Sequence, residues 1–95
     1  MEKLRTFVDP QLLEGIEVLT DRTTQSALRA VVRSLCVNEW EIARKLKENR
    51  EVVSEKLDVL VDNGFISRHE GELGSLPLYT PSIKGIRVFG GLTSV

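Results

Sequence analysis

Side chains able to contact an anionic polymer gather between residues 44 and 69. They are all polar or charged: Arg44, Lys45, Lys47, Asn49, Arg50, Glu51, Ser54, Glu55, Lys56, Arg68 and His69. The cations can neutralise phosphates, and a hydroxyl such as that of Ser54 can bond to a phosphate or a base edge. A helix N-terminus, expected here just after Asn49, also favours phosphate. This chemistry predicts contact with double-stranded DNA.

Four carboxylates occupy the same stretch, at spacings of four, three and four residues: Glu51, Glu55, Asp58 and Asp62. On a helix this spacing places them in one stripe, opposite the apolar face. Glu51 and Glu55 could accept a hydrogen bond from cytosine N4 in a major groove, although each unpaired carboxylate near phosphates lowers the affinity. Two other interpretations stay open: a solvated helix face, and a surface that docks a basic protein partner.

Catalytic and metal-binding arrangements are missing from the sequence. Without a Ser-His-Asp set, paired carboxylates or a glycine-rich phosphate loop, we expect no catalytic residue and no enzymatic activity. One cysteine and one histidine do not suffice for a metal site, and no cofactor is expected. Cys36, near the end of a predicted helix, is expected to be a small buried hydrophobe.

The composition is that of one small globular domain, residues 1–95, with 41% hydrophobic and 28% charged residues. There is neither an apolar run of membrane-spanning length nor a secretory signal, so the expected location is the cytoplasm, in association with the nucleoid. The net charge of −1 argues against a non-specific nucleic-acid coat. Residues 22–47 nevertheless hold six bases and two acids, so an electrostatic footprint would start there.

Apolar spacing predicts four helices in the first two thirds of the chain. Asp9-Pro10 can start a helix over 10–20, and a second one over 24–36 buries an apolar stripe that includes Leu35. Asn38 followed by Glu41 has the form of a capping box and starts a third helix. After a turn at 47–49, a fourth helix over 50–62 ends at Asn63-Gly64, a typical glycine C-cap.

Two strands and a short helix are predicted to follow. Residues 65–69 and residues 76–80 are each expected to form a strand, and the segment between them contains the glycines of a turn. Ser82 can cap a last helix over 82–89, which Gly85 should interrupt and Gly90-Gly91 should end. The expected class is mainly α with a small β-hairpin, an α+β fold.

Three fragments, taken in order, resemble the winged helix-turn-helix superfamily, especially small prokaryotic regulators of the MarR, ArsR and PadR kinds. They are Ile42-Ala43-x-x-Leu46, Val53-Ser54-x-x-Leu57-x-x-Leu60-x-x-x-Gly64-Phe65-Ile66 and Tyr79-x-x-Ser82-x-x-Gly85. The resemblance covers about residues 24–89. It implies a three-helix core over 24–66, a wing over 65–80 and a recognition helix near 50–62 that enters the major groove.

The resulting hypothesis is a DNA-binding transcriptional regulator. A single domain of this size contacts few bases, so a homodimer is expected, with the helices at 10–20 and 83–89 as candidate dimer surfaces. The alternative is a winged-helix protein-interaction module of a larger assembly, with a basic partner docked at Glu51, Glu55, Asp58 and Asp62. The near-neutral charge supports this alternative.

Overall fold

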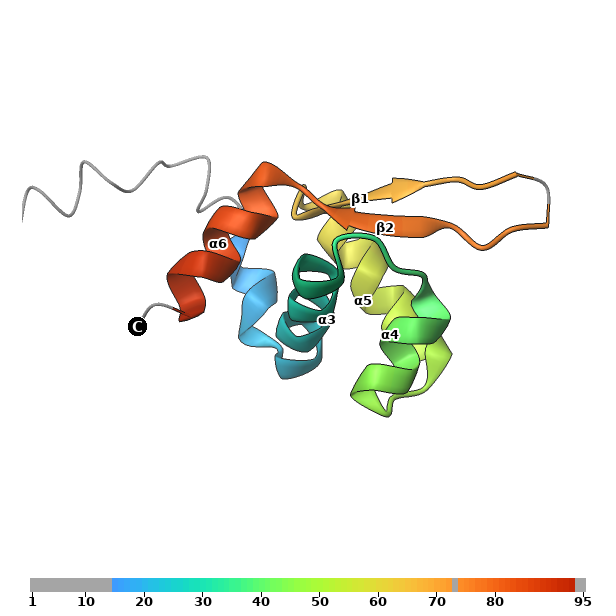
Figure 1. Ribbon diagram of the computed structural model, residues 1–95. Helices are drawn as coiled ribbons and strands as arrows, with labels where there is room; N and C mark the ends of the chain where they lie inside the picture. Colours follow the sequence, from blue (N-terminus) through green and yellow to red (C-terminus); the bar gives the residue numbers. More distant parts are fainter. Residues whose placement is uncertain (1–14, 73, 94–95) are drawn as a thin grey trace, which may run out of the picture.

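The computed structural model describes residues 15–72 and 74–93, which form helices packed beside a two-stranded antiparallel sheet (Figure 1). In chain order the elements are a 3-10 helix η1 (Ile16–Thr20), α3 (Arg22–Ser34), α4 (Glu39–Leu46), α5 (Arg50–Asp62), β1 (Ile66–His69), β2 (Leu78–Pro81) and α6 (Ile83–Thr93). The expected α+β class, mainly helical with a small hairpin, is confirmed. No helix in the described ranges is long and apolar enough to cross a membrane.

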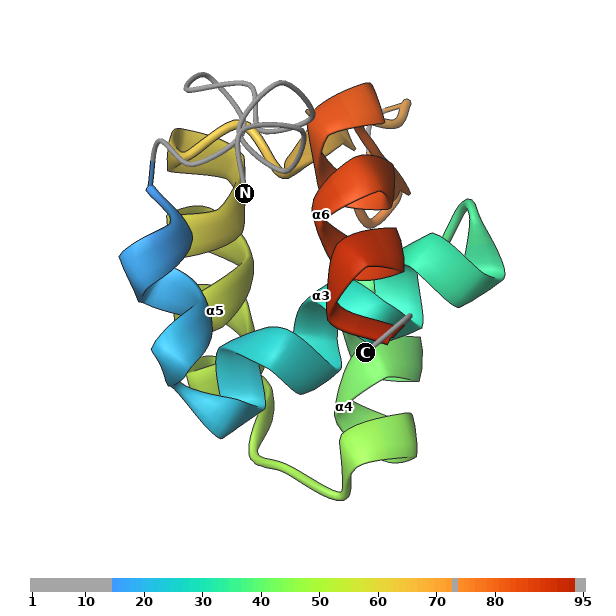
Figure 2. The ribbon, with the colours of Figure 1, turned by 90° about the vertical axis from the view of Figure 1, so that its left-hand side faces the viewer.

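Helix α3 lies at the centre of the molecule. It packs against η1, α4, α5, α6 and β2, and Figures 1 and 2 show these elements arranged around it. Its apolar positions recur at helical spacing, so Ala27, Leu28 and Val31 are fully buried. The rest of the core comes from α3 itself, from its neighbouring elements and from the connections between them: Leu19, Ala30, Val37, Ile42, Val53, Leu57, Leu60, Phe65, Ile66, Tyr79 and Val88.

Side-chain caps set the starts of three helices. The side chain of Asp21 accepts from the Thr24 backbone N–H at the start of α3, and that of Asn38 accepts from the Glu41 N–H at the start of α4. Asn49 does the same for α5, accepting from the Glu51 N–H at 2.8 Å. Each bond satisfies a backbone donor that has no partner within its helix.

The hairpin extends away from the helices (Figure 1). Strands β1 and β2 pair antiparallel, with Arg68 opposite Tyr79. On the other edge of β2, Val37 exchanges two backbone hydrogen bonds with Tyr79, of 3.1 and 2.7 Å. This bridge, which the sequence did not predict, joins the α3–α4 connection to the sheet.

The helix expected over 10–20 differs from the structure. Residues 10–14 lie outside the described residues, and residues 16–20 form a 3-10 helix instead of an α-helix. Gly15 stands before it with a φ of 79°, a left-handed conformation that does not belong to a right-handed helix.

The end of the second predicted helix was also placed wrongly. Helix α3 ends at Ser34, because Leu35 takes the left-handed conformation with a φ of 66° and caps it. Leu35 is therefore 62% exposed instead of belonging to the inward stripe. Cys36, expected to be buried, is exposed, and Val37 enters the core in its place.

The last helix is longer than predicted. Helix α6 runs from Ile83 to Thr93 without interruption, so neither Gly85 nor Gly90-Gly91 breaks it. Ser82 caps it as expected, since its Oγ accepts from the Gly85 N–H at 3.0 Å. Gly85 has a packing role instead, because the carbonyl group of Phe65 lies directly against it.

Candidate nucleic-acid interface

A three-residue turn fixes the angle between α4 and α5. Lys47 ends α4 in the left-handed conformation, with a φ of 54°, and its N–H donates to the carbonyls of Ala43 and Arg44. Asn49 then caps α5. Buried Ile42 on α4 and Val53 on α5 belong to the same core, so the two helices are held as one unit.

The two faces of α5 differ as the spacing predicts. Val53, Leu57 and Leu60 are fully buried, whereas the four carboxylates of the acidic stripe are all exposed: Glu51, Glu55, Asp58 and Asp62. At the N-terminal end Arg50 is exposed and Ser54 is half-buried. A ligand that approaches the outer face of α5 therefore meets both signs of charge.

Arg50 is positioned by a stacking contact. Its guanidinium carbon lies 4.4 Å from the centroid of the Trp40 ring, and its Nε lies 3.7 Å from Glu39 Oε1. A guanidinium over a tryptophan face is attracted by the ring quadrupole. Trp40 stays 50% exposed, so the stacked pair forms a surface feature between the first turns of α4 and α5. This contact joins two helices and was not predicted from the sequence.

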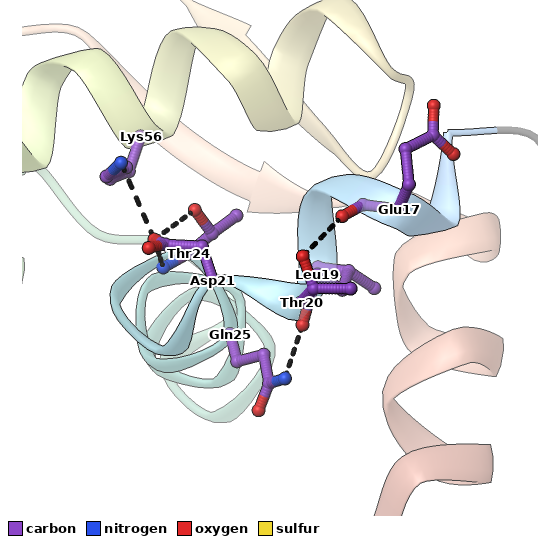
Figure 3. A network of polar contacts seen from close by, with 7 residues as sticks. All are labelled: Glu17, Leu19, Thr20, Asp21, Thr24, Gln25 and Lys56. Atoms are coloured by element: carbon purple, nitrogen blue, oxygen red, sulfur yellow. Dashed lines mark hydrogen bonds and ion pairs between the residues drawn. The ribbon is translucent and has the colours of Figure 1, made fainter.

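Lys56 faces α3 instead of the outer face of α5 (Figure 3). Its Nζ lies 3.5 Å from Asp21 Oδ2, and its side chain is only 24% exposed. Asp21 also accepts from the Thr24 hydroxyl at 2.8 Å and from the Thr24 N–H at 2.9 Å. Lys56 therefore connects α5 to the N-terminus of α3, which argues against the predicted contact of Lys56 with DNA.

The bonds to Asp21 predict a pH-dependent stability. Hydrogen bonds from the Thr24 side chain and backbone, followed by the charge of Lys56, lower the pKa of Asp21 below its ordinary value of 3.8. A lowered pKa in the folded state stabilises the protein above the unfolded-state pKa, and this contribution is lost as the pH falls through the folded-state pKa. Asp21→Asn should therefore be less stable than the wild type near neutral pH, and the difference should shrink below about pH 4.

Urea unfolding from about pH 6 to about pH 3 would measure this difference. Asp62→Asn is the matched control, because Asp62 is exposed and has no ion pair within the described residues. A gap between Asp21→Asn and wild type that stays constant over this pH range would contradict the prediction.

Arg68, on strand β1 of the hairpin, also forms hydrogen bonds within the protein. A guanidinium nitrogen of Arg68 donates to Asp58 on α5, and Nε of Arg68 donates to the Tyr79 hydroxyl at 3.1 Å. These two bonds, that to Tyr79 first, raise the pKa of Arg68. Nε2 of His69 lies 2.7 Å from the Thr80 hydroxyl, across the hairpin. Arg68 thus ties the hairpin to α5 and neutralises one carboxylate of the acidic stripe.

The cations of α4 and its turn are more accessible. Arg44, Lys45 and Lys47 are all exposed. Lys45 donates to Ser34 Oγ at 2.8 Å, whereas Arg44 and Lys47 form no ion pair with any described residue. Within residues 15–72 and 74–93, no group of three or more His, Cys, Asp or Glu side chains could hold a metal ion. The arrangement is suited to contacts with a large anionic surface.

Comparison with known proteins identifies the fold. No protein-family model matches the sequence, and no curated protein is significantly similar to it. A mutant of MarR from E. coli, complexed with operator DNA, matches with a TM-score of 0.72 over 90% of this chain, at 18% identity. HlyU from Vibrio cholerae matches with a TM-score of 0.75 over 99% of this chain and 96% of its own, at 15% identity. The chain has the winged helix-turn-helix fold.

In the terms of this fold, α4 and α5 are the helix-turn-helix, and β1 and β2 are the wing. A mutant of ZitR from Lactococcus lactis is also similar, with a TM-score of 0.69 over 78% of this chain, at 19% identity. The chain spans only 51% of the ZitR structure and 63% of the MarR structure, but nearly the whole length of HlyU. The resemblance stated from the sequence is confirmed at the level of the fold.

Proposed function

We propose that this winged helix binds double-stranded DNA as a transcriptional regulator, with the first two turns of α5 in the major groove. The observation that carries the proposal is the exposed, polar N-terminal half of α5, which follows the exposed cations of α4 and its turn. The similarity in fold to a MarR structure complexed with operator DNA supports it. A non-enzymatic role is part of the same proposal.

The proposed contacts divide into two kinds. Arg44, Lys45, Lys47, Arg68 and His69 would contact the phosphate backbone, where they add affinity without reading sequence. Arg50, Glu51, Ser54 and Glu55 would face base edges or nearby phosphates, with the two glutamates accepting from cytosine N4. Asn49 positions these residues by capping the N-terminus of α5. Lys56 is not among the proposed DNA contacts, because its side chain faces Asp21.

Binding to mixed-sequence duplex DNA tests the proposal. Fluorescence anisotropy should show binding at about 50 mM salt that weakens steeply towards about 200 mM, as release of counterions from phosphates requires. No binding at the lower salt concentration would overturn the proposal. A footprint on a selected sequence would then show whether two half-sites lie about one helical turn apart, as a symmetric dimer requires.

Homodimerisation through α6 belongs to the proposal. Ile83 is 73% exposed and Ile86 is 45% exposed, one helical turn apart on α6. We expect Ile83→Lys combined with Ile86→Lys to convert the dimer into a monomer, because two charges would enter an apolar contact. Light scattering after size exclusion would measure the mass. Leu78→Lys, at another exposed apolar side chain, is the control and should leave the mass of the assembly unchanged.

A second candidate function is the docking of a basic protein partner. It is favoured by Glu51, Glu55 and Asp62, which are exposed on α5 and form no ion pair with any described residue. Asp58 differs from them, since Arg68 already neutralises it. If the DNA titration fails, capture of a partner that Glu51→Lys combined with Glu55→Lys abolishes would support this function.

A further inference from the structure

Trp40 is a large aromatic side chain that the core does not use. It lies in the first turn of α4, is 50% exposed, and belongs neither to the buried core nor to the partly buried side chains packed against it. Its ring instead contacts the guanidinium of Arg50, whose carbon lies 4.4 Å from the ring centroid. Packing of the core therefore does not explain why a tryptophan stands at this position.

Helix stability does not explain Arg50 either. It is the first residue of α5, where the positive end of the helix dipole disfavours a cation. Its Nε lies 3.7 Å from Glu39 Oε1, and its side chain is 47% exposed. An ion pair this open to solvent contributes little to the stability of a fold. A role in binding accounts for this cation better than a role in folding.

The stack leaves the terminal donors of Arg50 available. A guanidinium is planar, and its five N–H donors lie along its edges. The ring of Trp40 lies against the guanidinium carbon, and Glu39 lies beside Nε. The two terminal nitrogens, Nη1 and Nη2, form no hydrogen bond or ion pair with a described residue. Arg50 therefore presents a pair of unbonded donors in an orientation that the stack holds.

Among the described cations of the proposed DNA interface, Arg50 alone has both properties. Arg68 donates through a terminal nitrogen to Asp58, so its fork is partly occupied. Arg44 has neither an ion pair nor a ring contact within the described residues, so no such contact orients its guanidinium. The lysines carry a point charge and have no planar fork.

We propose that Trp40 is a positioning residue, which holds Arg50 so that its two terminal nitrogens bind one guanine; this inference rests on the DNA-binding function proposed above. Guanine presents two acceptors, O6 and N7, in the major groove, and their spacing matches the fork of an arginine. Because the stack orders Arg50 before binding, less side-chain freedom is lost when the complex forms. A target sequence should therefore contain a guanine beside the N-terminus of α5.

Substitution of single guanines in the DNA tests the contact. The probe is a duplex that the wild-type chain selects from a random-sequence pool, with its guanines replaced one at a time by 7-deazaguanine, which lacks N7 but still pairs with cytosine. Anisotropy titrations should find at least one guanine whose replacement weakens wild-type binding about fivefold or more. Arg50→Lys keeps the charge but lacks the fork, so it should remove this penalty and leave the salt dependence unchanged.

Two outcomes would overturn the contact with guanine. One is the absence of any guanine at which Arg50→Lys and Arg50→Ala remove the penalty. The other is an equal loss of affinity for every duplex in Arg50→Ala, because Arg50 would then contact only phosphate.

A double-mutant cycle tests the positioning role of Trp40. Trp40→Ala should weaken binding of the selected duplex about threefold or more, because Arg50 must then be ordered during binding. The same substitution made in Arg50→Ala should have no further effect. Trp40→Phe keeps an aromatic ring beside Arg50 and should bind nearly as tightly as the wild type. Equal losses from Trp40→Ala in both backgrounds would overturn the positioning role, since Trp40 would then support only the fold.

Tryptophan fluorescence tests the stack without DNA. Trp40 is the only tryptophan of the chain, so its emission reports on this site alone. Arg50→Ala should increase quenching by acrylamide, a neutral quencher, because it uncovers the ring. Arg87→Ala is the control, since Arg87 is exposed on α6, and it should leave the quenching unchanged. Unchanged quenching in Arg50→Ala would overturn the inference, because the guanidinium would then not cover the ring.

The failure of this inference can be told apart from the failure of the proposed function. Absence of DNA binding by the wild-type chain would overturn both. DNA binding in which Arg50, Trp40 and a guanine are not coupled would overturn the inference alone.

Discussion

Gly85→Ala should destabilise the folded chain by about 1–3 kcal/mol, the usual cost of forcing an extra methyl group into a packed site. A Cβ at this position would meet the carbonyl oxygen of Phe65 far inside van der Waals contact, and its carbonyl carbon at 3.0 Å. This oxygen cannot move freely, because it accepts from the Ser82 N–H at 3.1 Å and the Phe65 ring is fully buried. The clash outweighs the gain of about 1 kcal/mol that alanine normally brings to a helix interior.

Gly90→Ala is the matched control in the same helix. A Cβ there would meet no atom within 4 Å, so this variant should be neutral or more stable by up to about 1 kcal/mol. Urea unfolding of both variants gives the two free energies of unfolding. Equal stabilities would mean that α6 does not pack against the backbone at Phe65 as closely as described.

Local patterns predicted the helices well where a cap and an apolar stripe agree. Asn38 and Asn49 each cap the helix that was expected to begin beside it, and Val53, Leu57 and Leu60 form the buried face of α5. These features depend on residues within one or two turns of one another, so a sequence contains all the information that they need.

The ends of helices depended on contacts that a sequence does not display. Leu35 continues the apolar period of α3, yet it takes the left-handed conformation that ends α3, and Val37, two residues later, pairs with Tyr79, forty-two positions further along the chain. Gly85 was expected to interrupt a helix, because glycine is a poor helix former. In the structure Gly85 lies within α6. Glycine is required at this position because a Cβ there would clash with the carbonyl group of Phe65.

In the candidate site, too, local features could be predicted from the sequence, whereas contacts between elements could not. Spacing alone places the acidic stripe on the exposed face of α5. Spacing does not show that Arg68 pairs with Asp58, that Lys56 reaches Asp21 or that Arg50 stacks on Trp40. Each of these contacts joins two elements, so the partners of these cations within the protein could be identified only from the fold.

Removing bases and removing acids around α5 should change the affinity for DNA in opposite directions. Arg44→Ala combined with Lys47→Ala removes two exposed cations that have no ion pair within the described residues. If both contact phosphate, affinity for mixed-sequence DNA should fall about tenfold or more, and the slope of log affinity against log salt should become shallower by ~2. Arg87→Ala on α6 removes a cation far from these contacts and should leave the slope unchanged.

Glu51→Gln combined with Glu55→Gln should raise the affinity for mixed-sequence DNA several-fold, because two carboxylates near phosphates are neutralised without loss of side-chain volume. On a selected site the same variant should lose discrimination at the positions where the glutamates accept from cytosine N4, by about 1–3 kcal/mol for each base pair read. Anisotropy titrations with both kinds of duplex would separate the two effects. If α5 serves only to dock a protein, neither pair of substitutions should alter DNA affinity beyond the effect of net charge measured with Arg87→Ala. Opposite responses of the two pairs would therefore place the DNA backbone beside α5, and a loss of discrimination would add that Glu51 and Glu55 read bases.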